Sequence, residues 1–377
     1  MQRNSDVLVV GAGVIGAAIG WRCAQRGLSV TLVDPDPGRG AWHTAAGMLS
    51  PTTELHYGEE PLFHLGRASL ASYPQFCAEL VEQTGIDPEF WECGTLSTAW
   101  DAADLATLRQ LLEFGHSLGA DAELVAAADL RALEPALAPG LTGGMLAHDH
   151  QVDPRLLHAA LLAAADTCGA VITVGTARVR VSDDRAVGVE LDDGTFVSAA
   201  TVVLAAGAWS GALDEIPESA RPKVRPVKGQ VLRLRPSRPV LGRVVRALIK
   251  GVPVYLVPRR NGDVLVGASL EEVGFDVRPR AGAVYELLRD AQTAVPEFAD
   301  AELVDVSTGL RPGSPDNAPL VGPSPIPGLV YATGHYRNGI LLTPITADGI
   351  AAYLADGELP EALQPFSPAR FATEVTT

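Results

Sequence analysis

Three glycines near the N-terminus have the spacing of a site for the phosphates of a dinucleotide. The sequence GAGVIG, residues 11–16, follows the apolar run 7–10 and precedes a helical pattern that extends to about Arg26. The first glycine permits a tight turn, the second lets the backbone approach a pyrophosphate, and the third lets the helix pack closely on the strand. The N–H groups at the start of that helix would bind phosphate oxygens.

An acidic residue, Asp34, ends the next apolar run, which covers residues 28–33. It lies 18 residues beyond Gly16, close to the separation at which a carboxylate binds the ribose hydroxyls of the adenosine half and disfavours a 2′-phosphate. The combined pattern predicts a strand, a helix and a second strand around a dinucleotide. By itself it does not distinguish FAD from NAD.

More elements are needed to complete this fold. A helix is predicted over residues 156–168, because Asp153 can cap it and Pro154 suits its first turn. Strands are predicted at 171–174, at 201–204 before the Gly207 turn, and at 328–332. Helical periodicity covers residues 61–84 and 101–138, and a last helix extends from about Asn338 to Leu354.

Residues 224–310 differ from this pattern. Several short runs alternate apolar and polar residues, which is typical of a half-buried antiparallel sheet, and one helix is expected near residues 285–295. We therefore predict an α/β protein with a discontinuous, Rossmann-like dinucleotide-binding domain and an α+β substrate domain built on an antiparallel sheet. The first domain comprises residues 1–56, 149–217 and 318–377, and the second comprises residues 57–148 and 218–317.

Charge and cysteine content exclude several classes of partner. The formal net charge of −16 argues against nucleic acids and against anionic membranes, both of which require a basic face. No apolar run reaches the length of a membrane span. The four cysteines are scattered without C-x-x-C pairs, so neither a metal site nor a disulfide framework is indicated. We expect a cytoplasmic protein.

Segments spread over nearly the whole chain resemble one enzyme family, the D-amino-acid-oxidase-like FAD-dependent amine oxidoreductases. Within that family the resemblance is to the branch that oxidises glycine for thiamine biosynthesis. The last two of the following segments discriminate best, because a glycine-rich N-terminal motif occurs in many nucleotide folds. The segments are 11–16, 45–49, 153–154, 205–209, 227–230, 309–312 and 334–342.

The resemblance implies non-covalent FAD, with its isoalloxazine ring between the two domains. The N–H groups of residues 334–339, ahead of a helix, would stabilise negative charge at the N1 and C2 carbonyl edge of the ring. A covalent link through His43 is an alternative. The residues expected to contact the cofactor are Gly11, Gly13, Val14, Ile15, Gly16, Asp34, Thr44, Ala45, Ala46, Gly47, Met48, Val179, Gly207, His335, Tyr336, Arg337, Asn338, Gly339, Ile340 and Leu341.

The resemblance also assigns residues to a substrate pocket. Arg311 occupies the family's carboxylate-binding position, where a guanidinium can grip a carboxylate with two hydrogen bonds. Tyr255 and Arg337 are the other expected catalytic residues, and Met48 and Leu270 are expected to line the pocket. Leu270 and Pro253 depart from the methionine and histidine of the family branch, which leaves the substrate size open.

The implied reaction is oxidative deamination of glycine, and also of sarcosine or small D-amino acids. A hydride would pass from Cα to flavin N5, O2 would be reduced to H2O2, and the imine would feed thiazole synthesis. The alternatives are a sarcosine, D-proline or D-amino-acid oxidase or dehydrogenase of the same family, or a flavin module acting on a macromolecular amine. The expected partners are a small amino acid and O2, in a homo-oligomer, with a tetramer favoured.

Overall fold

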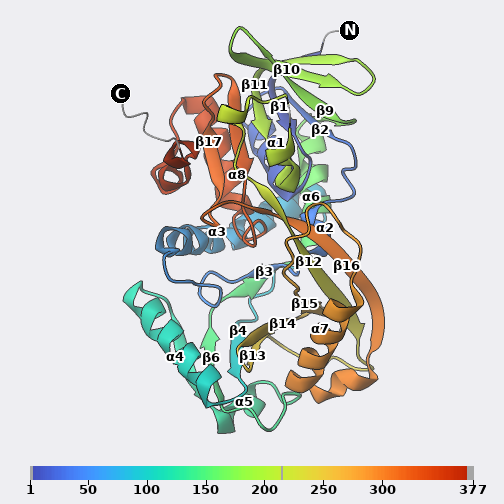
Figure 1. Cartoon of the computed structure of the whole chain (residues 1–377). Coiled ribbons are helices and arrows are strands. Elements are labelled where there is room, and N and C mark those ends of the chain that lie inside the picture. The colour runs from blue at the N-terminus through green and yellow to red at the C-terminus, as the bar shows by residue number, and fades with distance from the viewer. Residues whose placement is uncertain (1–2, 214, 372–377) are drawn as a thin grey trace.

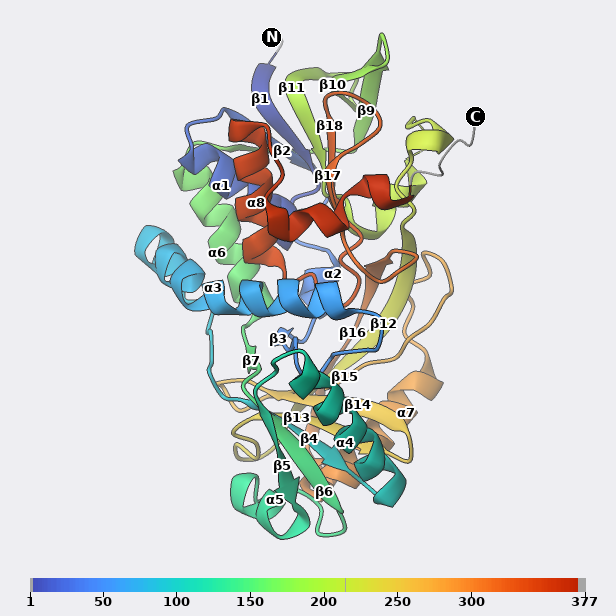
Figure 2. The same cartoon turned by 90° about the vertical axis from the view of Figure 1, so that its left-hand side faces the viewer.

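The computed structural model describes residues 3–213 and 215–371, which form two large sheets (Figures 1 and 2). The first sheet has the order β17-β18-β11-β1-β2-β8, with β9 and β10 attached beside β11. All of its neighbours on that path pair in parallel except β17 with β18. Its strands are β1 (Arg3–Val10), β2 (Val30–Asp34), β8 (Val171–Val174), β9 (Ala177–Ser182), β10 (Arg185–Leu191), β11 (Phe196–Leu204), β17 (Leu320–Pro323) and β18 (Leu329–Thr333).

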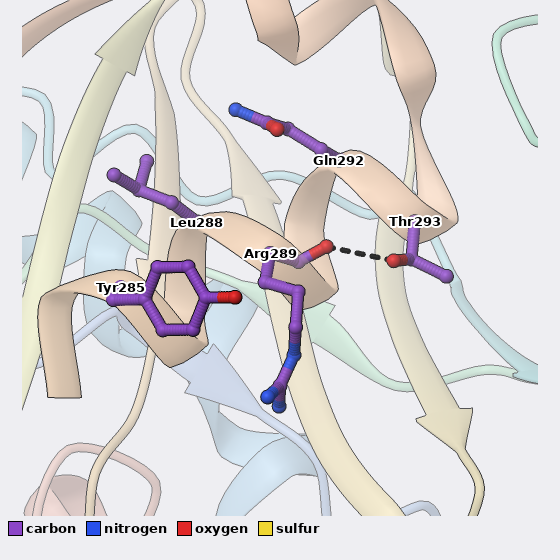
Figure 3. Close-up of a pocket in the computed structure, with 5 residues that line it drawn as sticks. All are labelled: Tyr285, Leu288, Arg289, Gln292 and Thr293. Atoms are coloured by element: carbon purple, nitrogen blue, oxygen red, sulfur yellow. Dashed lines mark hydrogen bonds between the residues drawn. The ribbon is translucent and has the colours of Figure 1, made fainter. Parts of the chain in front are cut away.

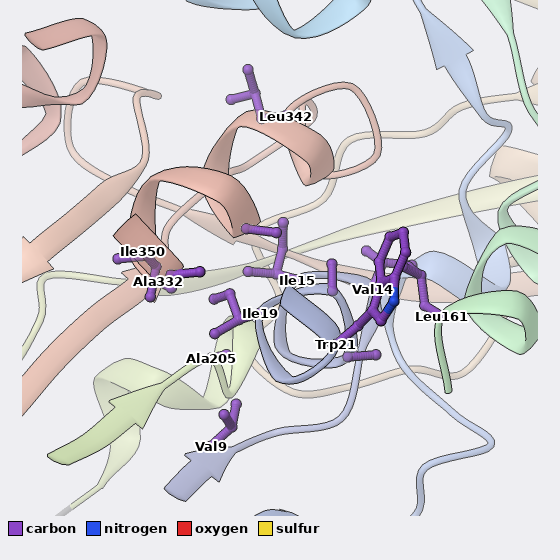
Figure 4. Packing of buried hydrophobic residues seen from close by; sticks show 14 of the residues in the cluster. Val9, Val14, Ile15, Ile19, Trp21, Leu161, Ala205, Ala332, Leu342 and Ile350 are labelled. Carbon is purple, nitrogen blue, oxygen red and sulfur yellow. The ribbon is translucent and has the colours of Figure 1, made fainter. Parts of the chain in front are cut away.

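Three helices cover one face of this sheet, α1 (Val14–Gln25), α6 (Pro154–Thr167) and α8 (Thr343–Asp356). Figure 4 shows the core that they enclose, in which Ile19 and Trp21 of α1 are fully buried. Close approach of α1 depends on small residues, since a Cβ at Gly20 would lie 2.9 Å from Leu32 of β2. The predicted parallel sheet with covering helices is confirmed.

The second sheet has the order β16-β12-β15-β14-β13-β4-β6-β5. It is antiparallel, as predicted, except that β13 and β4 pair in parallel. Helix α7 (Ala281–Ala294) packs on one face through Leu287 and Ala291, so the opposite face is left to meet the first domain. The strands are β4 (Thr95–Ala99), β5 (Ala122–Ala126), β6 (Gly143–Ala147), β12 (Arg225–Arg235), β13 (Val244–Ile249), β14 (Val252–Pro258), β15 (Val264–Gly267) and β16 (Glu302–Gly313).

The remaining elements connect the two sheets. Helix α3 (Glu60–Thr84) lies beside α6 and α8 and crosses the molecule below them in Figure 2. The others are α2 (Ala41–Thr44), β3 (Met48–Leu49), α4 (Ala102–Ser117), α5 (Ala127–Leu133), β7 (His150–Gln151) and the 3₁₀ helices η1 (Gly207–Ala212), η2 (Glu218–Ala220), η3 (Pro296–Asp300), η4 (Glu361–Phe366) and η5 (Pro368–Phe371).

Several elements differ from the sequence-based expectations. The helix predicted over residues 101–138 was wrong in the middle of that range, because β5 lies there and pairs with β6. The last helix begins at Thr343 and not near residue 338, since residues 339–342 form turns. Helix α3, which lies within residues 57–148, packs its apolar face into the first core.

No helix within residues 3–213 and 215–371 combines the length and the apolar character that a membrane crossing would require.

Candidate active site and cofactor site

The GAGVIG turn lies where β1, β11 and α1 meet. Gly11 has a φ of 101°, and a Cβ there would lie 2.5 Å from the carbonyl oxygen of Ala205. At Gly13 a Cβ would meet only the Trp42 ring, at 3.6 Å. In the part of the chain that the structure describes, the N–H groups of residues 13–15 donate to no acceptor. These N–H groups at the start of α1 fit phosphate oxygens.

Asp34 is brought to the same turn, at the end of β2. Its Oδ2 accepts a hydrogen bond from the N–H of Ala12 at 2.8 Å. The other side of the turn is held by His158 of α6, whose Nε2 lies 2.7 Å from the Ala12 carbonyl and whose ring stacks on Trp42. Sequence reasoning missed His158, because only the packing of α6 beside α1 brings it to the turn.

The segment 44–48 lies between this turn and the second sheet. Gly47 has a φ of 76°, which glycine adopts without strain, and β3 pairs with β7 beyond it. The Thr44 side chain lies against Gly309 of β16, where a Cβ would come within 2.9 Å of it. The buried Arg259 donates from Nη2 to the Ala46 carbonyl at 2.6 Å. These contacts fix the segment facing the sheet.

The loop 334–342 forms the other border of the site. Helix α3 fixes it, because Ser69 donates to the Leu341 carbonyl at 2.6 Å and the Tyr73 hydroxyl donates to the Ile340 carbonyl. With these carbonyls turned to α3, the N–H groups of residues 339–341 donate to no acceptor within the described ranges. Such donors suit a negatively charged carbonyl edge.

Some buried residues of this loop have structural contacts and no evident role in a reaction. The His335 ring is buried, its Nε2 lies 3.1 Å from the Thr346 hydroxyl, and burial lowers its pKa to about 3. It is therefore neutral over the physiological range. Asn338 is also buried and closes the turn through its N–H to the His335 carbonyl at 2.9 Å, while Tyr336 donates its N–H to Pro312 at 2.9 Å.

Two outlying members of the predicted cofactor set lie beside the first sheet. Val179 of β9 is buried, and its N–H donates to the Glu215 carboxylate at 3.1 Å. Gly207 follows β11 with a φ of 52°, and its carbonyl accepts from the Thr333 hydroxyl at 3.1 Å. Their expected contacts with the cofactor stay predictions.

Arg311 and Tyr255 converge on one face of the second sheet. A Cβ at Gly229 would lie 2.5 Å from Cζ of Arg311, so the guanidinium extends from β16 across β12. A Cβ at Gly267 would lie 2.5 Å from Cε2 of Tyr255, so that ring extends from β14 across β15. Arg311 Nη1 also donates to the Ser269 carbonyl at 3.2 Å. The two glycines leave the space in which both side chains lie flat.

Electrostatics determine the protonation of this pair. Burial raises the pKa of Tyr255, and the positive charge of Arg311 offsets part of that increase. Tyr255 therefore carries its proton at neutral pH and can donate a hydrogen bond. A guanidinium and a hydroxyl side by side form a site for a carboxylate.

Arg337 has a different environment from Arg311. It forms an ion pair with Glu59, just before α3, and donates from Nη2 to the Glu54 carbonyl at 3.3 Å. Its Nε is buried and has no hydrogen-bond partner within residues 3–213 and 215–371. These contacts connect Arg337 to the segment 54–59, and its expected catalytic role stays a prediction.

The two residues expected to line the pocket differ in exposure. Met48 is half-buried and, like Tyr255, packs against a small buried cluster that includes Ala46 and Val231. Leu270 is 66% exposed and follows Ser269, at the edge of the site. Pro253 is exposed as well. The structure therefore brings Met48, Tyr255 and Arg311 to one region, with Leu270 at its margin.

Sequence reasoning missed the residues that support this region, Gly267, Ser269, Glu54 and Glu59. Gly229 falls in the segment 227–230 that carried the family resemblance, but its steric role was not predicted. A signal was present, because an isolated glycine in a strand indicates a close approach by another group.

A separate surface hollow lies on α7 and is lined by Tyr285, Leu288, Arg289, Gln292 and Thr293 (Figure 3). All five residues come from that one helix, and Thr293 bonds to the Arg289 carbonyl at 2.7 Å. Because α7 covers the face of the sheet opposite to Arg311 and Tyr255, this hollow is not part of the candidate site.

Comparisons with known proteins match this chain to one enzyme family. Residues 6–353 match the family described as FAD dependent oxidoreductase (DAO). The chain is 36% identical over 381 residues to the glycine oxidase of Geobacillus kaustophilus, covering 100% of this chain and 99% of that protein. The crystal structure of a glycine oxidase from the same organism aligns with a TM-score of 0.90 at 35% identity, covering 98% of this chain and 99% of that one.

A further relative is longer. The chain is 33% identical to the bifunctional protein ThiO/ThiG of Trichormus variabilis, covering 99% of this chain but 56% of that protein. The chain therefore spans about half the length of such bifunctional relatives.

Proposed function

The chain belongs to the DAO family of FAD-dependent oxidoreductases, and we propose on that basis that it catalyses oxidative deamination of glycine with O2 as electron acceptor. The observation that carries the proposal is the convergence of Arg311 and Tyr255 on the sheet face beside the cofactor segment 44–48. A site with one guanidinium and one hydroxyl suits the carboxylate of a small amino acid. The absence of a large apolar side chain at Gly229 and Gly267 leaves these groups free to reach it.

Arg311 binds the substrate carboxylate and so orients Cα, and the Tyr255 hydroxyl donates a hydrogen bond to the same carboxylate. FAD, when bound, would supply the redox chemistry, namely removal of a hydride from Cα and reduction of O2. No described residue needs to act as a general base if the substrate binds with a neutral amine. The role of the protein is orientation and electrostatic stabilisation.

The cofactor groups of this chain support that arrangement. The N–H groups of residues 13–15 and 339–341 donate to no acceptor within the described ranges; the first set suits the pyrophosphate, and the second suits the carbonyl edge of the flavin ring. The Asp34 carboxylate suits the ribose hydroxyls, and it would bind them in place of the Ala12 N–H that it accepts in this structure. We propose that the protein binds FAD without a covalent link.

We propose that the product of this reaction is used in thiamine biosynthesis. The relatives named ThiO/ThiG support a role in which the imine product feeds thiazole synthesis. The four cysteines are free, with Cys23 and Cys77 buried, which supports a cytoplasmic protein. We also propose a homo-oligomer, which light scattering of the purified protein would measure.

The test is anaerobic mixing of the FAD-loaded protein with glycine, sarcosine, D-alanine or D-proline while flavin absorbance is followed. Rapid bleaching by glycine, with peroxide formed on admission of air, is the expected result. If glycine leaves the flavin oxidised and another amine bleaches it, the proposed substrate is wrong. If bleached flavin persists in air, the protein is a dehydrogenase.

A further inference from the structure

A second arginine lies on the same sheet face as the candidate carboxylate site. Strands β13 and β14 pair antiparallel, with Arg246 directly opposite Tyr255. Residues directly opposite in such a pair point to the same face and are close neighbours. Because the Tyr255 ring extends toward β15, Arg246 lies on its other side, at the end of the site away from Arg311.

Arg246 forms an ion pair with an acidic residue, Glu54. Its Nη1 donates to the Thr53 carbonyl at 2.6 Å and lies 3.3 Å from Oε1 of Glu54. The two side chains are 20% and 16% exposed, so the pair is largely shielded from water. Shielding strengthens the interaction of these charges with each other and with any charged group nearby.

Glu54 is fixed in place by its backbone as well. Arg337 donates to its carbonyl at 3.3 Å. The preceding residues are anchored by the fully buried Asp149, which accepts from the N–H of Thr52 at 3.1 Å and the N–H of Thr53 at 2.7 Å. These backbone contacts therefore hold Glu54 beside Arg246.

The charges of Glu54 and Arg246 both reach the candidate site. The Glu54 carboxylate raises the pKa of Tyr255, and the Arg246 guanidinium lowers it. Glu54 thus neutralises Arg246 and leaves Arg311 as the cation available to a carboxylate. A substrate with a second carboxylate would meet the negative charge of Glu54, and like charges in contact are strongly unfavourable.

We propose, building on the function proposed above, that Glu54 restricts the site to amino acids with one carboxylate, and that Arg246 binds a second carboxylate when Glu54 is replaced by a residue without charge. Glu54 and Arg246 are then specificity-determining residues at the end of the site opposite to Arg311. The substrate class excluded by Glu54 is dicarboxylic amines such as iminodiacetate and D-aspartate.

The test uses unreactive ligands, so that binding is measured apart from turnover. Acetate and malonate are titrated into the FAD-loaded protein, and Kd is taken from the change in flavin absorbance. Glu54→Gln is expected to raise the affinity for malonate relative to acetate by about tenfold or more. Glu297→Gln is the matched control, since Glu297 pairs with the exposed Arg238 and its loss should leave the ratio unchanged.

The double variant Glu54→Gln, Arg246→Met identifies the group that binds the second carboxylate. Loss of the malonate gain in the double variant supports Arg246. Persistence of the gain without Arg246, or an unchanged ratio in Glu54→Gln, would overturn the proposal. Oxidation of iminodiacetate relative to glycine should follow the same ratio. Failure of the proposed function is a separate result, because it would appear as unbleached flavin with glycine in the unaltered protein.

Discussion

Gly229→Ala should impair the enzyme by displacing Arg311 without removing it. A Cβ at this position would lie 2.5 Å from Cζ of Arg311, whereas ordinary van der Waals contact begins at 3.4 Å. The guanidinium must therefore move by about 1 Å, and a displacement of that size costs on the order of 10²-fold in rate. The fold should tolerate the change, because the group that must move is the end of a flexible side chain and Gly229 has no positive φ.

The assay is kcat/KM for glycine, with thermal unfolding and the flavin spectrum measured on the same samples. Gly282→Ala is the matched control, because a Cβ at Gly282 would meet nothing within 4 Å. We expect about a hundredfold loss in the first variant, none in the second, and bound flavin in both. Full activity in a folded Gly229→Ala protein would refute the position assigned to Arg311.

Three other predictions address the carboxylate site, the cofactor and acid stability. Arg311→Ala should lower kcat/KM for glycine by about 10²–10³-fold, from the loss of a charge-assisted hydrogen-bonded pair, with flavin retained; an unchanged value would contradict the assignment. Asp34→Ala should weaken FAD binding by about tenfold or more, measured by titration of the apoprotein, and an unchanged Kd would exclude the ribose contact. The pKa of His335 is lowered from 6.5 to about 3 by burial, so the unfolded state binds the extra proton between these values and stability falls as the pH drops below 6.5. His335→Gln should remove up to about 1.4 kcal/mol per pH unit of that dependence, measured by denaturant unfolding at pH 4.5 and 7, and identical slopes would contradict it.

The dinucleotide fold could be predicted from local sequence because each of its signals acts over a few residues. The glycines of residues 11–16, the apolar runs that became β1 and β2, and the Asp153-Pro154 start of α6 depend on backbone geometry and capping, which are local. Prediction failed over residues 101–138, where β5 forms only because β6 is available to pair with it.

The candidate site was predicted in part. Arg311 and Tyr255 were identified through family resemblance, and the structure brings them together. The interactions of Arg337 with Glu59 and of Arg246 with Glu54 were not foreseen, since the partners are separated by well over a hundred residues and no spacing rule connects them.

The sequence by itself determined the type of cofactor turn, the strands and helices that surround it, and the residue types able to grip a carboxylate, because these properties depend on neighbours along the chain. Only the tertiary structure decided which charges are free. Arg246, Arg311 and Arg337 are chemically identical in the sequence, but two of them meet carboxylates in the fold while Arg311 meets a backbone carbonyl. Strand register and the packing of α3 place those partners, and that placement distinguishes a substrate-binding arginine from a structural one.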